Sequence, residues 1–418
     1  MTKPELENEM NDLRDRYARL ASLSLSLDLS RGKPAADQLN LTEGLLTAVS
    51  TSADTIIDGT DTRNYGVPDG LPAMKKIFSD LFTIPESNII IGGASSLRLM
   101  FDTVARAMLF GTSEGKTPWA YQGKIKFICP VPGYDRHFGI CEAFGIEMIT
   151  VPMTKDGPDM DRVEALVASD ASIKGIWCVP KYSNPTGVTY SNETVKRLAS
   201  LKCAADDFRI FYDNAYAIHD LYDKGDELAD IFAYAKEAGN PDIVYEFSSF
   251  AKISFPGGGV SMFASSDANV AYARKILSKQ TICCDKINQL RHIRYFGDAD
   301  GVRAHMKKHA SLLRPKFEIV RETFERELAP YGVGEWTNPN GGYFLSLDLP
   351  KGTAKRTYEL AKNIGVTLTK VGATFPYGID PDDSNLRIAP TFATLDNLRL
   401  ACEVLCVCAK IAALEKMI

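Results

Sequence analysis

The sequence predicts an α/β protein with a large domain on a mostly parallel sheet and a smaller α+β domain. The middle of the chain alternates short apolar runs with helical segments, which is the order of a wound parallel sheet. The last third instead combines long helices with a half-buried strand. The 418 residues also exceed what one simple core usually holds, so two domains are expected.

The first predicted element is an amphipathic helix near the start of the chain, with Pro4 in its first turn. Its apolar positions recur at intervals of three and four residues: Leu6, Met10, Leu13, Tyr17 and Leu20. Such a helix packs either on the core of its own chain or on a partner subunit. The spacing does not decide between these two interpretations.

Six β-rich runs follow in the middle of the chain. Several are apolar on both faces, as are strands of a sheet covered by helices. The runs are residues 125–131, 146–152, 173–180, 208–213, 242–250 and 260–265. Helical stretches such as 193–203 separate some of them. Ligands of such sheets usually bind beyond the carboxyl ends of the strands.

The last third begins with a long charged helix near 300–330, in which Pro315 predicts a kink or break. Residues 341–350 (GGYFLSLDLP) alternate like a half-buried strand. A final helix carries one apolar stripe: Leu398, Cys402, Leu405, Ala409 and Ala412. The predicted division is a large domain at 51–300 and a small domain at 301–418, which the N-terminal segment 1–50 joins.

Composition and charge exclude several classes of function. The net charge is −5 without any Lys/Arg block, so neither a nucleic-acid surface nor a polybasic membrane patch is expected. No apolar run is long enough to cross a bilayer, and the start MTKPELENEM lacks a signal-peptide core, so a cytoplasmic protein is expected. The nine cysteines form no C-x-x-C pair and no cluster with histidines, so no metal site is predicted and a reducing compartment fits best.

The segment SSFAKISFPGGG (248–259) places Lys252 directly after an apolar strand. A desolvated lysine can lose its proton and condense with an aldehyde. Ser248 and Ser249 precede it closely enough for their hydroxyls to reach a phosphate. A solvated surface charge is the commoner role of a lysine, but the end of an apolar strand argues against that role here.

A second segment, FRIFYDNAYAIHD (208–220), ends a strand at Asp213, three residues before Tyr216. A carboxylate at this position can hold a pyridine nitrogen protonated through a charge-assisted hydrogen bond. The alternative role of Asp213 is to cap a following helix.

Two glycine- and proline-containing turns add candidate polar groups. In the run SNPTG (183–187), Asn184 precedes a proline and its amide can donate to a ligand. In IIIGGASS (89–96), a strand passes through two glycines into a helix, whose first N–H groups form an anion site. Gly93, Ala94 and Ser95 are the candidates, although such a turn is often only structural.

Together with CPVPGYDRHFG (129–139), these motifs occur in the order seen in fold-type I pyridoxal-phosphate (PLP) enzymes, and the chain resembles the aspartate aminotransferase superfamily over nearly its whole length. The segments SRGKP (30–34), YGVPDGLP (65–72) and DSNLRIAPTF (383–392) extend this resemblance. RGKPAADQLNL and PKYSNPTG are most similar to subgroup Ic. The resemblance implies the aspartate aminotransferase fold, with a mostly parallel seven-stranded sheet in the PLP-binding large domain.

The resemblance also implies a role for each cofactor-binding side chain. Lys252 would form the Schiff base with PLP and carry the proton of transamination, and Ser249 would contact the phosphate. Asp213 would hold the pyridine nitrogen with support from His137. Tyr134 would stack on the ring, while Asn184 and Tyr216 would contact the phenolic oxygen.

Further roles concern the substrate and a partner. Arg387 would bind the substrate α-carboxylate through its bidentate fork, and the backbone of Gly32 would approach the same carboxylate. Tyr65 would reach the phosphate of the partner subunit in a homodimer with shared active sites. One position departs from the family, since Val260 replaces an arginine that commonly pairs with the phosphate. Backbone N–H groups, serines and Tyr65 would then have to meet the phosphate charge.

The resemblance to subgroup Ic implies a ping-pong exchange of L-aspartate and 2-oxoglutarate for oxaloacetate and L-glutamate. The distal carboxylate of such substrates requires a second cation, for which Arg291, Arg294 and Lys33 remain equal candidates. The alternatives are an aminotransferase for aromatic amino acids or 2-aminoadipate, a PLP enzyme of another reaction class, or a PLP-fold module of a transcription regulator. The regulators carry a basic N-terminal domain, for which the segment before Arg31 leaves no room.

Overall fold

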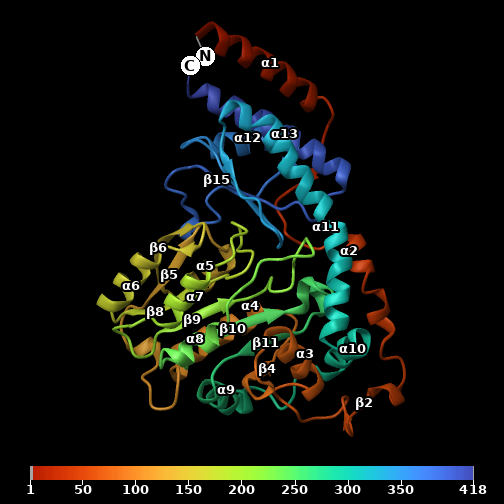
Figure 1. Ribbon diagram of the computed structural model, residues 1–418, viewed down its shortest axis with the longest axis vertical. Coiled ribbons are helices and arrows are strands. Elements are labelled where there is room, and N and C mark those ends of the chain that lie inside the picture. Colours follow the sequence, from red (N-terminus) through yellow and green to blue (C-terminus); the bar gives the residue numbers. More distant parts are fainter. Residues whose placement is uncertain (1–2, 418) are drawn as a thin grey trace.

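The computed structural model describes residues 3–417. Figure 1 shows a large part that contains the main sheet and its helices, and a smaller part around α1, α12, α13 and β15. The long helix α11 (Ala299–Glu327) runs from one part into the other (Figure 1). The predicted combination of a large α/β part with a smaller α+β part is confirmed, while the boundaries at residues 50 and 300 stay predictions.

The main sheet has eight strands. In spatial order they are β4 (Ile89–Ile91), β11 (Ser261–Ala264), β10 (Val244–Ser249), β9 (Arg209–Asp213), β8 (Ile173–Cys178), β5 (Lys126–Val131), β6 (Glu147–Thr154) and β7 (Gly157–Pro158). The five strands from β10 to β6 are parallel to one another, and β11 and β7 pair antiparallel with their neighbours. The mostly parallel seven-stranded sheet is confirmed, and the two-residue β7 adds an eighth strand at its edge.

Alternation along each strand sends side chains to two separate cores. Ile176 and Ile210 belong to the core on one face of the sheet, whereas Trp177 and Phe211 belong to the core on the other. The first core is covered by α6 (Met160–Ser169), α7 (Asn192–Ala199) and α8 (Ile231–Glu237). The second is covered by α4 (Ser96–Phe110), α5 (Asp135–Ala143) and α9 (Asp267–Gln280). Covered faces explain why these strands are apolar on both sides.

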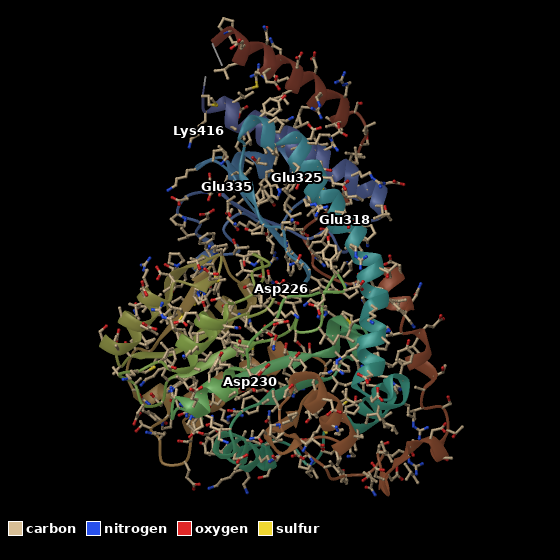
Figure 2. All side chains as sticks on the ribbon, viewed as in Figure 1. Asp226, Asp230, Glu318, Glu325, Glu335 and Lys416 are labelled. Carbon is tan, nitrogen blue, oxygen red and sulfur yellow. The ribbon has the colours of Figure 1, made fainter. Side chains whose placement is uncertain are left out.

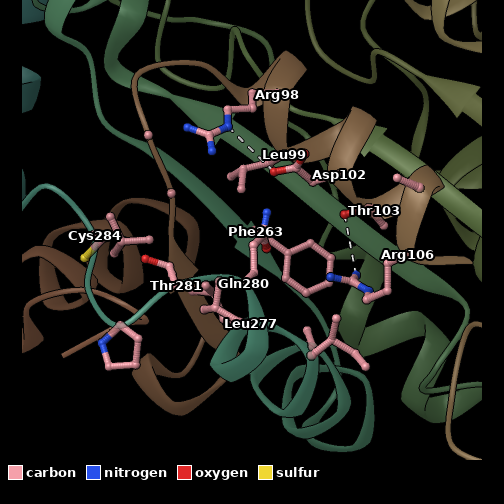
Figure 3. Close-up of a pocket in the computed structure, with 18 of the residues that line it drawn as sticks. Arg98, Leu99, Asp102, Thr103, Arg106, Phe263, Leu277, Gln280, Thr281 and Cys284 are labelled. Carbon is pink, nitrogen blue, oxygen red and sulfur yellow. Dashed lines mark hydrogen bonds and ion pairs between the residues drawn. The ribbon is translucent and has the colours of Figure 1, made fainter. Parts of the chain in front are cut away.

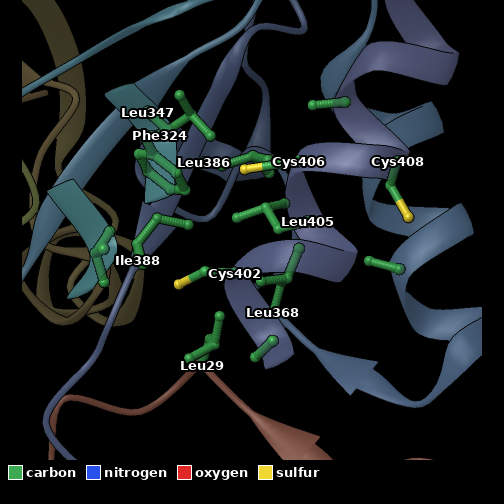
Figure 4. Close-up of a cluster of buried hydrophobic side chains, with 14 of the residues drawn as sticks. Leu29, Phe324, Leu347, Leu368, Leu386, Ile388, Cys402, Leu405, Cys406 and Cys408 are labelled. Atoms are coloured by element: carbon green, nitrogen blue, oxygen red, sulfur yellow. The ribbon is translucent and has the colours of Figure 1, made fainter. Parts of the chain in front are cut away.

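The smaller part is built around a three-stranded antiparallel sheet of β12 (Glu335–Trp336), β13 (Leu345–Asp348) and β15 (Asn385–Ile388). The helices α1 (Lys3–Ala21), α12 (Ala354–Ile364) and α13 (Leu395–Glu415) pack with it. Figure 4 shows Cys402, Leu405 and Cys406 of α13 directed toward Leu386 of β15 and Leu347 of β13. The apolar residues of α1 are buried in this same core, so the interpretation that α1 packs on its own chain is confirmed.

The predicted break at Pro315 is wrong, because α11 continues through it for 29 residues. Val302 and Met306 anchor the first half of α11 in the large part, and Phe317 and Val320 anchor its second half in the smaller part. Packing at both ends outweighs the hydrogen bond that a proline removes. Glu325 is exposed on α11 beside buried Phe324, as expected for an amphipathic helix (Figure 2).

Four two-residue strands and three helices also belong to the fold. They are β1 (Leu27–Asp28), β14 (Val366–Thr367), α2 (Ala36–Asn40), β2 (Ile56–Ile57), β3 (Thr60–Asp61), α3 (Pro72–Phe82) and α10 (Lys286–Phe296). Helix α7 ends at Ala199, earlier than the predicted helical stretch. Among the helices formed by residues 3–417, none combines the length and apolar character that crossing a bilayer demands.

Candidate active site

A pocket at the carboxyl ends of the central strands collects most of the polar side chains that the sequence singles out. Asp213 is the last residue of β9, Ser249 is the last residue of β10, and Lys252 follows in a 3-10 turn (Phe250–Lys252). The carboxyl ends of parallel strands meet at one edge of a sheet, so these side chains converge. The pocket is lined by seven of the predicted residues: Ser95, Tyr134, Asn184, Asp213, Tyr216, Ser249 and Lys252.

The Lys252 amine lies among aromatic rings. Its Nζ is 5.1 Å from the ring centre of Tyr216 and 5.8 Å from that of Tyr343, whose hydroxyl donates to the Lys252 carbonyl at 3.4 Å. Burial lowers the pKa of Lys252 below its ordinary value, and the positive charge of Arg387 adds to this effect against the opposing charge of Asp213. A lowered pKa makes the neutral, nucleophilic amine more accessible.

Asp213 is buried and only one of its carboxylate oxygens is occupied. His137 Nε2 lies 3.0 Å from Asp213 Oδ2, whereas Oδ1 has no hydrogen-bond partner among the described residues. The His137 ring stacks on Trp177, with centres 4.5 Å apart and planes 11° apart. A buried acceptor without a donor is rare in proteins, so Oδ1 marks a place for a ligand donor. No motif in the sequence pointed to the supporting role of Trp177.

Two tyrosines line the pocket as protonated phenols. Burial raises the pKa of Tyr134 to about 12 and the pKa of Tyr216 well above its ordinary value. Both hydroxyls therefore keep their protons at neutral pH. The Tyr134 ring also contacts His137 edge-on, with centres 5.0 Å apart.

Arg387 on β15, in the smaller part, lies beside the Lys252 pocket and contacts its Asn184. Its Nη1 donates to Asp135 Oδ1 at 3.0 Å and to Asn184 Oδ1 at 3.4 Å. Because the Asn184 oxygen faces Arg387, the Asn184 NH₂ is available to a ligand in the pocket. The contact between Arg387 and Asp135 was not predicted from the sequence. The one available signal was that Asp135 directly follows Tyr134, a predicted site residue.

Gly32 is placed beside this arginine. A Cβ added at Gly32 would lie 2.2 Å from the ring of Phe344, whose centre is 5.0 Å from the Arg387 guanidinium carbon. Only a glycine lets the backbone pass this close to the ring. The entrance segment and Arg387 therefore both lie against Phe344.

The three residues predicted to form the anion site at α4 line two different pockets. Ser95 caps α4, accepts from Leu97 N at 3.2 Å and lines the Lys252 pocket. Gly93 and Ala94 line a neighbouring pocket instead. Ser248 donates its hydroxyl to the Asn214 carbonyl at 3.0 Å, which leaves Ser249 as the serine of β10 that lines the Lys252 pocket.

Tyr65 does not line the Lys252 pocket. Its side chain is 75% exposed, so its role toward a partner subunit stays a prediction.

The three candidates for binding a distal carboxylate differ in the contacts that they already make. Arg294 forms an ion pair with Asp54 at 3.4 Å, and Lys33 Nζ lies 3.9 Å from the ring centre of Phe392. Arg291 lines the same neighbouring pocket as Gly93 and Ala94.

Comparisons with known proteins identify the family. The profile described as aspartate amino-transferase matches residues 1–418. An aspartate aminotransferase of Corynebacterium glutamicum is 46% identical over 404 residues, which cover 97% of this chain and 93% of that protein.

Solved structures agree with this match. The crystal structure of an aspartate transaminase from Corynebacterium glutamicum superposes with a TM-score of 0.97 at 45% identity, covering 100% of this chain and 98% of the other. The alpha-aminoadipate aminotransferase of Thermus thermophilus shares the fold, with a TM-score of 0.75 at 19% identity over 94% of both chains. The chain therefore belongs to the aspartate aminotransferase family and is an aminotransferase of fold type I.

Proposed function

We propose that this protein is a PLP-dependent aspartate aminotransferase, which converts L-aspartate and 2-oxoglutarate to oxaloacetate and L-glutamate by a ping-pong mechanism. The observation that carries the proposal is one pocket that holds an amine, Lys252, and a half-satisfied buried carboxylate, Asp213. Arg387 lies beside this pocket and donates to its Asn184. The name of the Corynebacterium glutamicum relative at 46% identity supports the substrate.

The residues of the pocket fit PLP. The free Oδ1 of Asp213 is the acceptor that a protonated ring nitrogen requires, and the lowered pKa of Lys252 suits attack on an aldehyde. Ser95 at the start of α4 and Ser249 offer donors to a phosphate. When bound, PLP supplies the electron sink that stabilises the negative charge left on a substrate carbon after proton loss.

The side chains around this position then have separate tasks. Lys252 would hold the cofactor covalently, and its Nζ would accept and return the substrate Cα proton. The protonated phenol of Tyr216 and the NH₂ of Asn184 would donate to the phenolic oxygen of the cofactor. Tyr134 would cover one face of the cofactor ring, and His137 fixes the orientation of Asp213.

Substrate binding falls to the Arg387 side of the pocket. The α-carboxylate takes the guanidinium donors of Arg387 and approaches the Gly32 backbone. A carboxylate held by two donors is disfavoured as a leaving group, which favours transamination over decarboxylation. Lys33 is adjacent to Gly32 and is our candidate for the distal carboxylate, since Arg294 already pairs with Asp54.

We also propose a homodimer in which Tyr65 completes the phosphate site of the partner subunit. Its large exposed fraction within one chain supports this arrangement. In a dimer of this kind, both active sites depend on residues from both chains.

The test is a half-reaction screen with the purified, PLP-loaded protein. Amino acids are added one at a time, and the absorbance band of the lysine-bound cofactor is followed as it converts to the amine form. We expect aspartate and glutamate to convert it and aromatic amino acids to respond weakly. Conversion by aromatic amino acids or 2-aminoadipate, but not by aspartate or glutamate, would reject the proposed substrate.

A further inference from the structure

Arg291 on α10 carries a guanidinium group without a partner. Its Nε is buried without a hydrogen-bond partner among residues 3–417, while the side chain as a whole is half-buried. Guanidinium has five donors and stays charged at every physiological pH. A buried donor without an acceptor is rare, so the Nε of Arg291 is available to an anionic ligand.

The side chain of Arg291 lines a pocket of about 210 Å³ whose walls are mostly backbone. Gly92, Gly93 and Ala94 form one wall, and residues 257–260 (three glycines and Val260) form the other. Such walls let a ligand approach main-chain N–H groups closely.

The other polar side chains of this pocket are already engaged. Asp285 accepts from Asn288 N at 3.0 Å as the cap of α10, and the Asn288 amide donates to the carbonyls of Gly258 and Gly259. Gln289 accepts from Leu71 N at 2.8 Å. Among the described residues that line the pocket, Arg291 is therefore the cation left for an anionic ligand.

This glycine pocket adjoins the Lys252 pocket. Gly93 and Ala94 lead directly into Ser95, the cap of α4, which lines the Lys252 pocket. A Cβ added at Gly259 would lie 2.8 Å from the Ala94 carbonyl oxygen and 2.9 Å from Ala251, the neighbour of Lys252. The backbone of Ala94, Ala251 and Gly259 thus forms the shared wall, beside a helix N-terminus that favours an oxyanion.

Arg98 is a second arginine near Gly93 and serves for comparison. One of its Nη atoms lies 3.4 Å from a Cβ added at Gly93. Unlike Arg291, its side chain is 69% exposed and pairs with Asp102 of the same helix at 3.7 Å (Figure 3). Arg291, by contrast, is half-buried and its Nε has no acceptor among the described residues.

We propose that Arg291 and the backbone of the glycine pocket form the cationic side of the cofactor-phosphate subsite, opposite the start of α4. This inference rests on the proposed function. Val260 cannot supply the positive charge that an arginine commonly supplies at its position. The inference assigns that charge to Arg291 on α10 instead. The ligand class is a phosphate monoester carried by a pyridine ring.

The test compares two ligands that differ only in the phosphate group. Dissociation constants of PLP and of pyridoxal, which lacks the phosphate, are measured on cofactor-free protein by fluorescence quenching. We expect Arg291→Gln to weaken PLP binding about tenfold to hundredfold, the effect of one charge-assisted contact, and to leave pyridoxal binding unchanged. Arg291→Lys keeps the charge and should recover part of the loss. The matched control Arg98→Gln should change neither constant.

Two results would overturn the inference. An equal loss of PLP and pyridoxal affinity in Arg291→Gln would show a structural role. An unchanged PLP constant with a raised KM for aspartate would assign Arg291 to the substrate carboxylate instead. Either result would leave the proposed function standing, which fails separately if the wild-type protein binds no PLP.

Discussion

His137 Nε2 lies 3.0 Å from Asp213 Oδ2, with both side chains buried and the imidazole held flat against Trp177. The contact occupies one carboxylate oxygen and leaves the other, in the pocket, without a partner among the described residues. The orientation of the Asp213 carboxylate therefore depends on His137 and, through it, on Trp177, two residues that lie far from Asp213 in the sequence.

Replacing Asp213 with Asn should remove the charge opposite the cofactor nitrogen while keeping the size of the side chain. We expect kcat to fall at least about 100-fold, because a preorganised charge is lost at the reacting centre. Steady-state kinetics with aspartate measures this. His137→Asn keeps the carboxylate and should lose less activity. An Asp213→Asn variant with the kcat of the wild type would remove Asp213 from the mechanism.

Lys252 should be the residue that holds PLP covalently. Borohydride treatment of the loaded wild-type protein should add the mass of the reduced cofactor to one peptide, and Lys252→Ala should show no such addition. Lys181→Ala is the control, since Lys181 is a buried lysine that donates to the Ala217 carbonyl at 2.9 Å. Peptide mass spectrometry reads the site, and a label on any other lysine would contradict the assignment.

Arg387→Lys should weaken substrate binding, because an ammonium group cannot reproduce the bidentate fork. We expect kcat/KM for aspartate to fall about tenfold to hundredfold, with a smaller effect on the affinity for PLP. Arg399→Lys, which exchanges an exposed arginine of α13, is the control. The assignment fails if kcat/KM is retained in Arg387→Lys.

Glu246 should make stability depend on pH. Its carboxyl is buried, and burial raises its pKa to about 8, against the hydrogen bond from Asn214 and with the help of the Asp230 charge. The unfolded carboxyl has a pKa near 4.5, so the folded state binds more protons between these values. The free energy of unfolding should therefore fall as pH rises from about 4.5 to 8, by at most about 1.4 kcal/mol per pH unit from this group.

Glu246→Gln should lack this contribution, so its stability relative to the wild type should grow as pH rises. Urea unfolding at several pH values gives the comparison, with Glu322→Gln on the exposed face of α11 as control. A constant difference between Glu246→Gln and wild type across this range would show that Glu246 is ionised in the folded protein.

Gly259 should tolerate no side chain, although its φ of −66° is open to any residue. The added Cβ would meet backbone atoms of Ala94 and Ala251 below 3.0 Å, so Gly259→Ala should cost about 1–3 kcal/mol of stability. Gly257→Ala is the matched control, because a Cβ there meets nothing within 4 Å. Equal unfolding midpoints for the two variants would refute the close contact.

Much of the fold follows from local pattern. The apolar run at residues 208–213 predicted a strand buried on both faces, and Ile210 and Phe211 indeed enter opposite cores. Motif order placed Lys252, Asp213 and Asn184 in one site, since consecutive parallel strands end at the same edge. Pro315 shows the limit of local rules, because packing at both ends of α11 keeps the helix continuous.

The sequence by itself thus determined most of the elements and their burial, because these depend on neighbours a few residues away. Only the tertiary structure decided which groups are left unpaired. Arg387 donates a hydrogen bond to Asp135, which lies 252 positions away in the sequence, and the Ser248 hydroxyl donates to the Asn214 carbonyl. Arg291 lines the glycine pocket, and its Nε has no partner among the described residues. Such pairings depend on how separate elements pack together, a relationship that no spacing within one segment encodes.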